Sequence, residues 1–278
     1  MTTTQQSKAR LLHRLHRAGD PLVLANVWDA AGARLVAAAG AGAVATASAS
    51  VSWTLGFPDG DRADLAAVLA QTARVVTAAG ELPVTADLES GFAETAAGVG
   101  ESVTALLATG AVGVNLEDAL HGGATPLRPV AEAAERIAAA RAAADAAGVE
   151  LFVNARTDVY LLAVGDPEQR LEAALTRARA YLDAGASGIF VPGVGDQETV
   201  AALAEALPAP LNVMAGPGAP AVPELAKLGV ARISLGPGLA SVAYAALRRA
   251  AEEVYATGTY GALSGGLSYQ ELNQLLAD

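Results

Sequence analysis

The stretch AEAAERIAAARAAADAAGVELFVNARTD, residues 131–158, contains the unit that is repeated along the chain. Residues 131–148 have the pattern of an amphipathic helix, with arginine and glutamate on the solvent side. Gly148 stands where helices commonly end, and the apolar run LFVNARTD begins at Leu151. A continuous run of this kind is typical of a strand that is buried on both faces. The stretch therefore predicts a helix followed by a buried strand.

Seven further apolar runs alternate with helical segments in the same way. In chain order the eight runs are LVLANV (22–27), AVATAS (43–48), PVTADLE (83–89), VGVNLED (112–118), LFVNARTD (151–158), SGIFVPG (187–193), PLNVMAG (210–216) and ARISLG (231–236). Repeated strand–helix units form a parallel sheet, and eight of them predict an α/β fold closed into a (β/α)8 TIM barrel. A doubly wound open sheet is the alternative, but no GxGxxG follows the first run.

Two helices are expected outside the repeated units. One covers residues 8–18 and closes the bottom of the barrel. The other covers residues 268–278 and follows the glycine-rich linker GTYGALSGG. We interpret residues 1–278 as a single barrel domain, with 257–278 as linker plus C-terminal helix. That helix either packs on its own barrel or is swapped between subunits.

Composition narrows the class of protein. The formal net charge is −11, which argues against nucleic acid and anionic membranes as partners. The chain has no cysteine, so disulfides and thiol catalysis are excluded. The polar N-terminus lacks a signal-peptide core, and a cytoplasmic protein is expected. The lysines, Lys8 and Lys227, are expected away from the barrel mouth, which argues against a Schiff-base aldolase.

Carboxylates gather at the carboxyl ends of the predicted strands, where TIM barrels hold their chemistry. Asp87 and Glu89 are two residues apart and are expected to face the same way, and Glu117 ends the next strand. Three converging carboxylates repel one another unless a cation lies between them, and oxygen ligands favour Mg²⁺. The alternative is that they cap helices or pair with arginine. Asp118 and Asp158 are the better cap candidates.

Other polar residues near these strand ends have two interpretations each. Arg156 is suited to bind a substrate carboxylate in bidentate fashion, or to pair with Glu117 or Asp158. Asn212 is either a donor to a second carboxylate or a turn residue. His121 follows the fourth strand and is either a proton donor or a solvated loop residue.

The segment SVSWTLGFPDGD, residues 50–61, is interpreted as a loop. It is either a lid with Asp59 at its tip or an ordinary connection with a turn. Trp53 and Phe57 are expected to be exposed on it. His13 and His16 share one face of the N-terminal helix, and both are expected at the surface.

Four segments, in this order, resemble motifs of the isocitrate lyase/phosphoenolpyruvate mutase superfamily. Residues 26–61 resemble its opening strand, helix and gating loop, and TADLESGF (85–92) resembles its metal motif. VNLED (114–118) and NARTD (154–158) resemble two motifs at later strand ends. The resemblance runs from about residue 22 to residue 239.

This resemblance implies a Mg²⁺-dependent barrel, with Mn²⁺ as the alternative ion, which is usually tetrameric and often swaps its last helix. The residues matching its metal ligands, direct or through water, are Asp87, Glu89 and Glu117. We assign catalysis to Arg156, Asp59 and His121. We assign substrate binding to Thr46, Ala47, Ser48, Trp28 and Asn212.

The segment after the fourth strand, EDALHGGATPLRP (117–129), departs from the family pattern. It lacks the cysteine of the isocitrate and methylisocitrate lyases and the lysine and Asn-Ser pair of the mutases. We therefore expect a Mg²⁺-dependent lyase or decarboxylase that cleaves a C–C bond of a small 2-oxo or 2-hydroxy carboxylate through an enolate. The alternatives are a C–P bond enzyme, such as a phosphonopyruvate hydrolase or a mutase, and a non-catalytic metabolite-binding barrel. A homo-oligomer, dimer or tetramer, is expected.

Overall fold

The eight expected strands are all present, each shorter than the apolar run that predicted it. The computed structural model describes residues 2–277, with side chains from residue 5 onward. The strands are β1 (Leu22–Leu24), β2 (Val44–Ala45), β3 (Val84–Asp87), β4 (Gly113–Glu117), β5 (Phe152–Arg156), β6 (Gly188–Val191), β7 (Leu211–Met214) and β8 (Arg232–Ser234).

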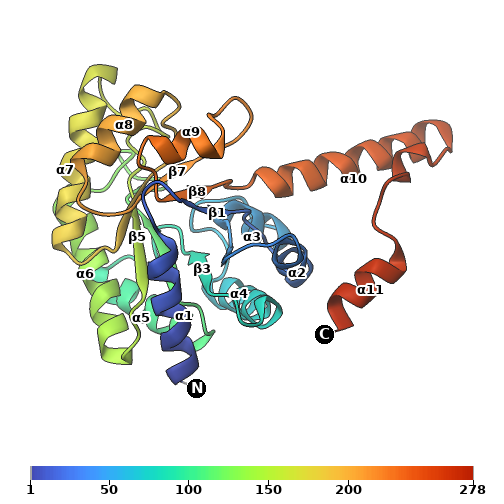
Figure 1. The fold of residues 1–278 in the computed structure, drawn as a ribbon, viewed down its shortest axis with the longest axis horizontal. Coiled ribbons are helices and arrows are strands. Elements are labelled where there is room, and N and C mark those ends of the chain that lie inside the picture. The colour runs from blue at the N-terminus through green and yellow to red at the C-terminus, as the bar shows by residue number, and fades with distance from the viewer. Residues whose placement is uncertain (1, 278) are drawn as a thin grey trace.

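Their pairing confirms the (β/α)8 barrel (Figure 1). Neighbouring strands are parallel and follow the order β1-β8-β7-β6-β5-β4-β3-β2. The ring closes beyond the ends of β1 and β2, where Val27 and Thr46 form a bridge. In it the Val27 N–H donates to the Ala45 carbonyl at 2.8 Å.

Helices follow the strands as the repeated unit predicts. The α-helices are α1 (Thr2–Leu15), α2 (Ala30–Ala38), α3 (Ser48–Thr54), α4 (Leu65–Ala79), α5 (Ala96–Ala108), α6 (Val130–Ala147), α7 (Arg170–Asp183), α8 (Gln197–Ala206), α9 (Val222–Lys227), α10 (Gly238–Thr257) and α11 (Tyr269–Ala277). Two short 3-10 turns, η1 (Pro167–Gln169) and η2 (Gly261–Leu263), precede α7 and follow α10.

Helix α1 closes the bottom of the barrel, although it begins and ends earlier than the predicted range of 8–18. Leu12 is fully buried there, and a Cβ on Gly113 would lie 2.7 Å from its Cδ2 atom. Gly113 therefore leaves the space into which α1 packs. The expected surface position of His16 is wrong, because its ring stacks on Phe152 at 3.8 Å between centroids. His13 is only partly exposed beside the same phenylalanine.

His16 is expected to make folding sensitive to acid. Burial lowers its pKa from 6.5 to about 3, so the folded state keeps the ring neutral while the unfolded chain protonates it. The unfolded chain binds more protons between these values, and stability falls as pH drops from 6.5 towards 3. The loss is up to about 1.4 kcal/mol per pH unit. Urea unfolding of wild type and His16→Phe across this range should show a shallower pH dependence in the variant; parallel curves would contradict the prediction.

The C-terminal segment leaves the barrel. In Figure 1, α10 projects away from the strands, and the chain then turns back so that α11 contacts α2. The predicted tail helix is confirmed, over Tyr269–Ala277. Among residues 2–277, no helix is both long enough and apolar enough to cross a membrane.

Candidate active site

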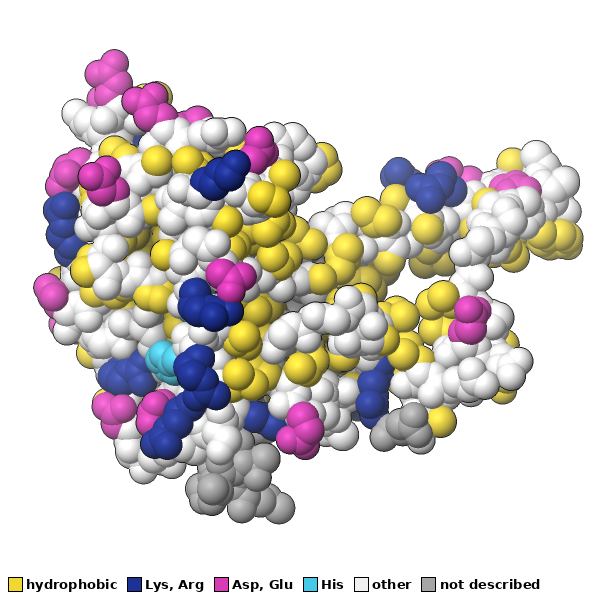
Figure 2. Space-filling view, viewed as in Figure 1, with side chains coloured by type: hydrophobic (Ala, Val, Ile, Leu, Met, Phe, Trp, Pro, Cys, Tyr) yellow, Lys and Arg dark blue, Asp and Glu magenta, His cyan; other side chains and the backbone are white. Residues whose placement is uncertain are grey.

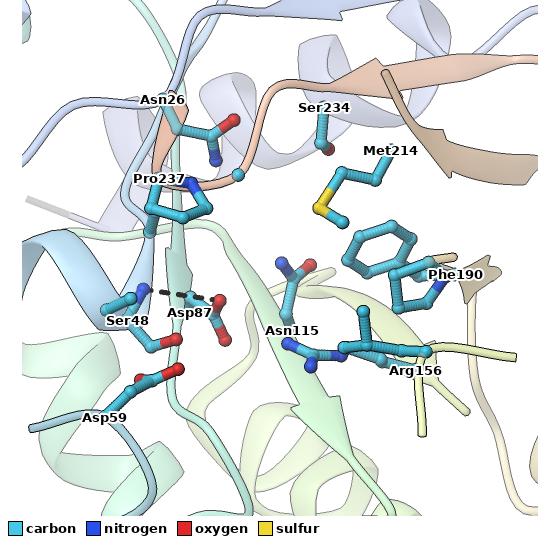
Figure 3. A pocket seen from close by; sticks show the side chains of 15 residues that line it. Asn26, Ser48, Asp59, Asp87, Asn115, Arg156, Phe190, Met214, Ser234 and Pro237 are labelled. Atoms are coloured by element: carbon cyan, nitrogen blue, oxygen red, sulfur yellow. Dashed lines mark hydrogen bonds between the residues drawn. The ribbon is translucent and has the colours of Figure 1, made fainter. Parts of the chain in front are cut away.

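A cavity of about 210 Å³ opens at the carboxyl ends of the strands. This is the end of the barrel at which the sequence predicts the chemistry. Figure 3 shows the side chains around it. The lining residues are Asn26, Ala47, Ser48, Ala49, Asp59, Asp87, Asn115, Arg156, Leu161, Phe190, Pro192, Met214, Ser234, Gly236 and Pro237.

Asp87 ends β3 and lines the cavity. Its backbone N–H donates to the Thr46 hydroxyl at 3.0 Å. Its carboxylate accepts from the backbone N–H of Ser48 at 3.4 Å and from that of Glu89 at 3.3 Å. Ala47 and Ser48 line the cavity, whereas Thr46 is buried and contacts Asp87 through its hydroxyl. The structure thus brings Asp87 and this predicted substrate-binding segment together.

Glu89 does not line the cavity, because β3 and its two-residue alternation end at Asp87. Glu89 has a φ of 49°. Its carboxylate accepts hydrogen bonds from the backbone N–H of Gly60 at 2.8 Å, the backbone N–H of Asp61 and the hydroxyl of Ser52. Burial raises the pKa of Glu89 to about 8. Glu89 therefore binds the backbone of the loop that follows α3.

Glu117 faces Arg156, its register partner at the end of the neighbouring strand. The guanidinium donates to Glu117 at 2.8 Å and to the two carboxylate oxygens of Asp158 at 2.6 and 2.9 Å. Burial acts to lower the pKa of Arg156, but the two carboxylates outweigh it and raise the pKa. These bonds use three of the five N–H groups of the guanidinium. The remaining ones can bind a ligand in the cavity.

His121 lies against Glu117 and does not line the cavity. Its Nε2 lies 2.8 Å from Glu117 Oε1. This hydrogen bond raises the pKa of His121, whereas burial raises that of Glu117 to about 7 despite Arg156 and His121. In this structure the imidazole therefore contacts Glu117 and does not reach a ligand in the cavity.

The three predicted metal ligands do not converge in this conformation. Within residues 5–277, no group of three or more His, Cys, Asp or Glu side chains is placed to hold a metal ion. Asp87 faces the cavity, while Glu89 and Glu117 bind protein groups. Asp87 is thus the one of the three that reaches the cavity.

The prediction that Asp118 and Asp158 cap helices is wrong. Asp158 pairs with Arg156. Asp118 accepts from the Tyr181 hydroxyl at 2.7 Å and from Arg177 at 3.1 Å. The reason is distance along the chain, because the helices after β4 and β5 begin only at residues 130 and 167.

Residues 50–61 are not one loop, as the sequence indicated. Helix α3 extends to residue 54, because no helix-breaking residue occurs before Gly56. Val51 and Ser52 are buried in this helix. Trp53 and Phe57 are exposed as expected. Asp59 lies at the cavity, and Figure 3 places it beside Ser48. Burial and the Asp87 charge raise the pKa of Asp59.

Besides Thr46, two further residues predicted to bind substrate do not line the cavity. Asn212 is buried, and its Oδ1 accepts from the Ser234 hydroxyl at 3.1 Å. Trp28 packs against the core, and its carbonyl accepts from Gln71 at 2.8 Å.

The sequence did not single out the far wall of the cavity. Phe190 and Met214 come from β6 and β7, and Asn115 comes from the middle of β4. Strand alternation could have indicated two of these residues. Asn115 lies two residues before Glu117, and Met214 lies two residues after Asn212, so each shares a strand face with a residue that the sequence did single out. In the sequence, an apolar strand residue that lines a cavity cannot be distinguished from one that packs in the core.

Known proteins resemble this chain over most of its length. The family model described as phosphoenolpyruvate phosphomutase matches residues 12–255. A crystal structure from Burkholderia cenocepacia J2315, provisionally named a phosphonomutase, is 46% identical with a TM-score of 0.84, and the match covers 90% of this chain and 99% of that one. The 2-methylisocitrate lyase of Escherichia coli K12 is 31% identical over 245 residues, 85% of this chain and 79% of that protein.

A further solved structure, oxaloacetate acetylhydrolase in complex with its product oxalate, is 25% identical. Its TM-score is 0.84, and the match covers 97% of this chain and 93% of that one.

Proposed function

The chain belongs to the isocitrate lyase/phosphoenolpyruvate mutase superfamily, whose members are lyases and mutases, and from this we propose a Mg²⁺-dependent lyase or decarboxylase. It cleaves a C–C bond of a small 2-oxo or 2-hydroxy carboxylate. One observation carries the proposal: the carboxylate of Asp87 and the guanidinium of Arg156 line the same small cavity. The first suits a hard cation and the second suits the carboxylate of the substrate.

The residues around Asp87 fit Mg²⁺, with Mn²⁺ as the alternative ion. Burial raises the pKa of Glu89 and Glu117, and the charge of Asp87 raises both further. A cation beside Asp87 would relieve this repulsion, and the oxygen-only donor set suits a hard ion. Asp87, Glu89 and Glu117 would hold the ion, directly or through water. When bound, Mg²⁺ supplies a Lewis acid for the negative charge that develops on the substrate.

The protein's own groups position the substrate. Glu117 and Asp158 hold the guanidinium of Arg156 from one side, so its free N–H groups have a fixed direction. Ser48 and Asp59 stand at the other side of the cavity (Figure 3). His121 acts as a positioning residue, because it holds Glu117 rather than touching the cavity.

The cavity favours C–C chemistry over the C–P alternative. Arg156 is the one cation among the lining residues, and two carboxylates already share its charge. Phe190 and Met214 make the wall beside it apolar, and the guanidinium carbon lies 5.8 Å from the centre of the Phe190 ring. A phosphonate carries more negative charge than a carboxylate, so a single arginine whose charge is already shared suits a carboxylate better. The alternative is favoured by the description of the matching family model, phosphoenolpyruvate phosphomutase, and by the provisional name of the Burkholderia protein.

A substrate panel tests the proposal. With Mg²⁺ present, the enzyme should turn over at least one 2-oxo or 2-hydroxy acid, for example oxaloacetate or an alkyl-substituted malate, faster than phosphonopyruvate. Chelation with EDTA should abolish turnover, and added Mg²⁺ should restore it. Turnover of phosphonopyruvate alone would establish the C–P alternative, and no metal-dependent turnover of any of these acids would favour a binding barrel.

We further propose that the enzyme is a homo-oligomer assembled through α10. This helix projects from the barrel, and Figure 2 shows hydrophobic side chains along it. Val242 is 67% exposed and Leu247 is 64% exposed. Exposed apolar surface of this extent on one projecting helix is typical of a subunit interface.

Light scattering in solution is expected to give a wild-type mass of a dimer or tetramer of the 27.7-kDa chain. A Val242→Glu/Leu247→Glu double variant should shift towards the monomer, because buried charges oppose association. Arg248→Gln, at an exposed position of the same helix, should leave the mass unchanged. A monomeric wild type would contradict assembly through α10.

A further inference from the structure

Asn115 belongs to the far wall of the cavity. It lies in the middle of β4, between its register partners Asp87 on β3 and Asn154 on β5. It is 3% exposed and lines the cavity. In Figure 3 its amide lies between Asp87 and Arg156, with the nitrogen on the side of Asp87.

The orientation of this amide follows from its neighbours. Asn115 Oδ1 accepts from Asn154 Nδ2 at 2.8 Å and from a terminal nitrogen of Arg232 at 3.4 Å. A flipped amide would place its N–H groups against these two donors. Among the described residues, no oxygen accepts a hydrogen bond from Asn115 Nδ2. Its N–H groups therefore remain for a ligand.

The other carboxamide in the cavity is not free in this way. Asn26 donates to the Thr46 carbonyl at 2.9 Å and accepts from the Leu235 N–H at 2.9 Å. Both ends of that amide serve to join neighbouring segments of the barrel. Asn115 is thus distinguished from Asn26 by its unused donors.

Arg232 is the unusual member of this group. It is fully buried inside the barrel, and within residues 5–277 no carboxylate oxygen lies within ion-pair distance of its guanidinium, whose hydrogen-bond partners are Asn115 and Ser234. Its other hydrogen bond runs to Ser234 at 3.4 Å, and one terminal nitrogen has no partner. The charge of Asp87 acts on Arg232 favourably from beyond ion-pair distance, but burial of a cation without a direct ion pair is costly. The guanidinium of Arg232, however, donates to the oxygen of Asn115. Its positive charge polarises the amide, which makes the N–H groups on the nitrogen of Asn115 stronger hydrogen-bond donors.

We propose that Asn115 donates hydrogen bonds to the negatively charged oxygen of the bound substrate, and that Arg232 and Asn154 act as positioning residues that orient and polarise its amide. The inference rests on the proposed function, because it assumes an enolate-like anion next to Asp87. It adds an oxyanion donor and gives a role to an arginine that lacks a direct ion pair inside the barrel.

Oxalate, which resembles the pyruvate enolate, is the probe. Calorimetric titration with Mg²⁺ present should show that Asn115→Ala weakens oxalate binding by about 10- to 100-fold. Arg232→Met and Asn154→Leu should each weaken it less. Because both act through Asn115, the Asn115→Ala/Arg232→Met double variant should bind as Asn115→Ala does, a non-additivity that a purely structural role of Arg232 would not produce.

A second variant guards against loss of folding. In Asn115→Asp the new carboxylate would pair with Arg232, so the melting temperature should be kept while oxalate, now facing a carboxylate, is repelled. Oxalate binding by wild type and Asn115→Ala with equal affinity would overturn the inference alone. If the losses of oxalate affinity in Asn115→Ala and Arg232→Met multiply in the double variant, Arg232 does not act through Asn115 and its proposed role is overturned. Failure of the wild type to bind oxalate with Mg²⁺ would overturn the proposed function and this inference together.

Discussion

Replacing Asp87 with asparagine is expected to reduce metal-dependent turnover by about 10³-fold or more. The amide has nearly the same size and keeps one of the two hydrogen bonds, because the backbone N–H groups of Ser48 and Glu89 donate to different oxygens of Asp87. Both bonds are long, at 3.4 and 3.3 Å, so the loss of one is expected to leave the local fold intact. The amide lacks the negative charge that would hold Mg²⁺ at the cavity. Steady-state rates on the preferred acid, together with calorimetric titration of Mg²⁺, measure both parts of this expectation.

Asp64→Asn is the matched control. Asp64 caps α4 through the N–H of Ala67, and asparagine caps helices as well as aspartate does. Its turnover and Mg²⁺ affinity should equal those of the wild type. An Asp87→Asn variant that still binds Mg²⁺ and turns over within a few-fold of the wild type would show that Asp87 does not hold the metal.

Replacing Arg156 with methionine is expected to abolish turnover and to destabilise the fold by roughly 3–5 kcal/mol. The substitution leaves the buried carboxylates of Glu117 and Asp158 without their cation. These groups would then take up protons on folding, so the folded variant binds more protons than the unfolded chain. Its stability should therefore fall as pH rises. Urea unfolding at several pH values between 5 and 8, beside turnover assays, measures the effect.

A surface pair provides the comparison for Arg156. Arg179 pairs with Glu172 at 3.3 Å, with both side chains more than half exposed. Its replacement by methionine should change the free energy of unfolding by less than about 1 kcal/mol. If Arg156→Met unfolds at the same urea concentration as Arg179→Met at neutral pH, the buried charge cluster is not a major source of stability.

The barrel could be predicted from the sequence because its signals are local. Each strand is a continuous apolar run, and the residues that end helices are visible as glycines, such as Gly148 with a φ of 67°. Asp87 and Arg156 could be predicted as site residues for the same reason, since each is the last residue of a regular strand. Strand alternation still sets the direction of a side chain at that position.

Beyond the last residue of a strand this argument no longer holds. Glu89 follows the end of β3, and its direction is set by the backbone of residues 60 and 61. His16 follows the end of α1 and is buried through stacking on Phe152. In both cases the deciding contact comes from a segment far away in the chain.

The sequence by itself determined the eightfold barrel and the strand ends that carry charge. Only the tertiary structure decided which of those charges face the cavity and which face one another. Asn115 and Arg232 show the reason, because they are 117 positions apart and meet inside the barrel. Periodicity reports which residues share a strand face, but closure of the ring selects the residues that touch across it.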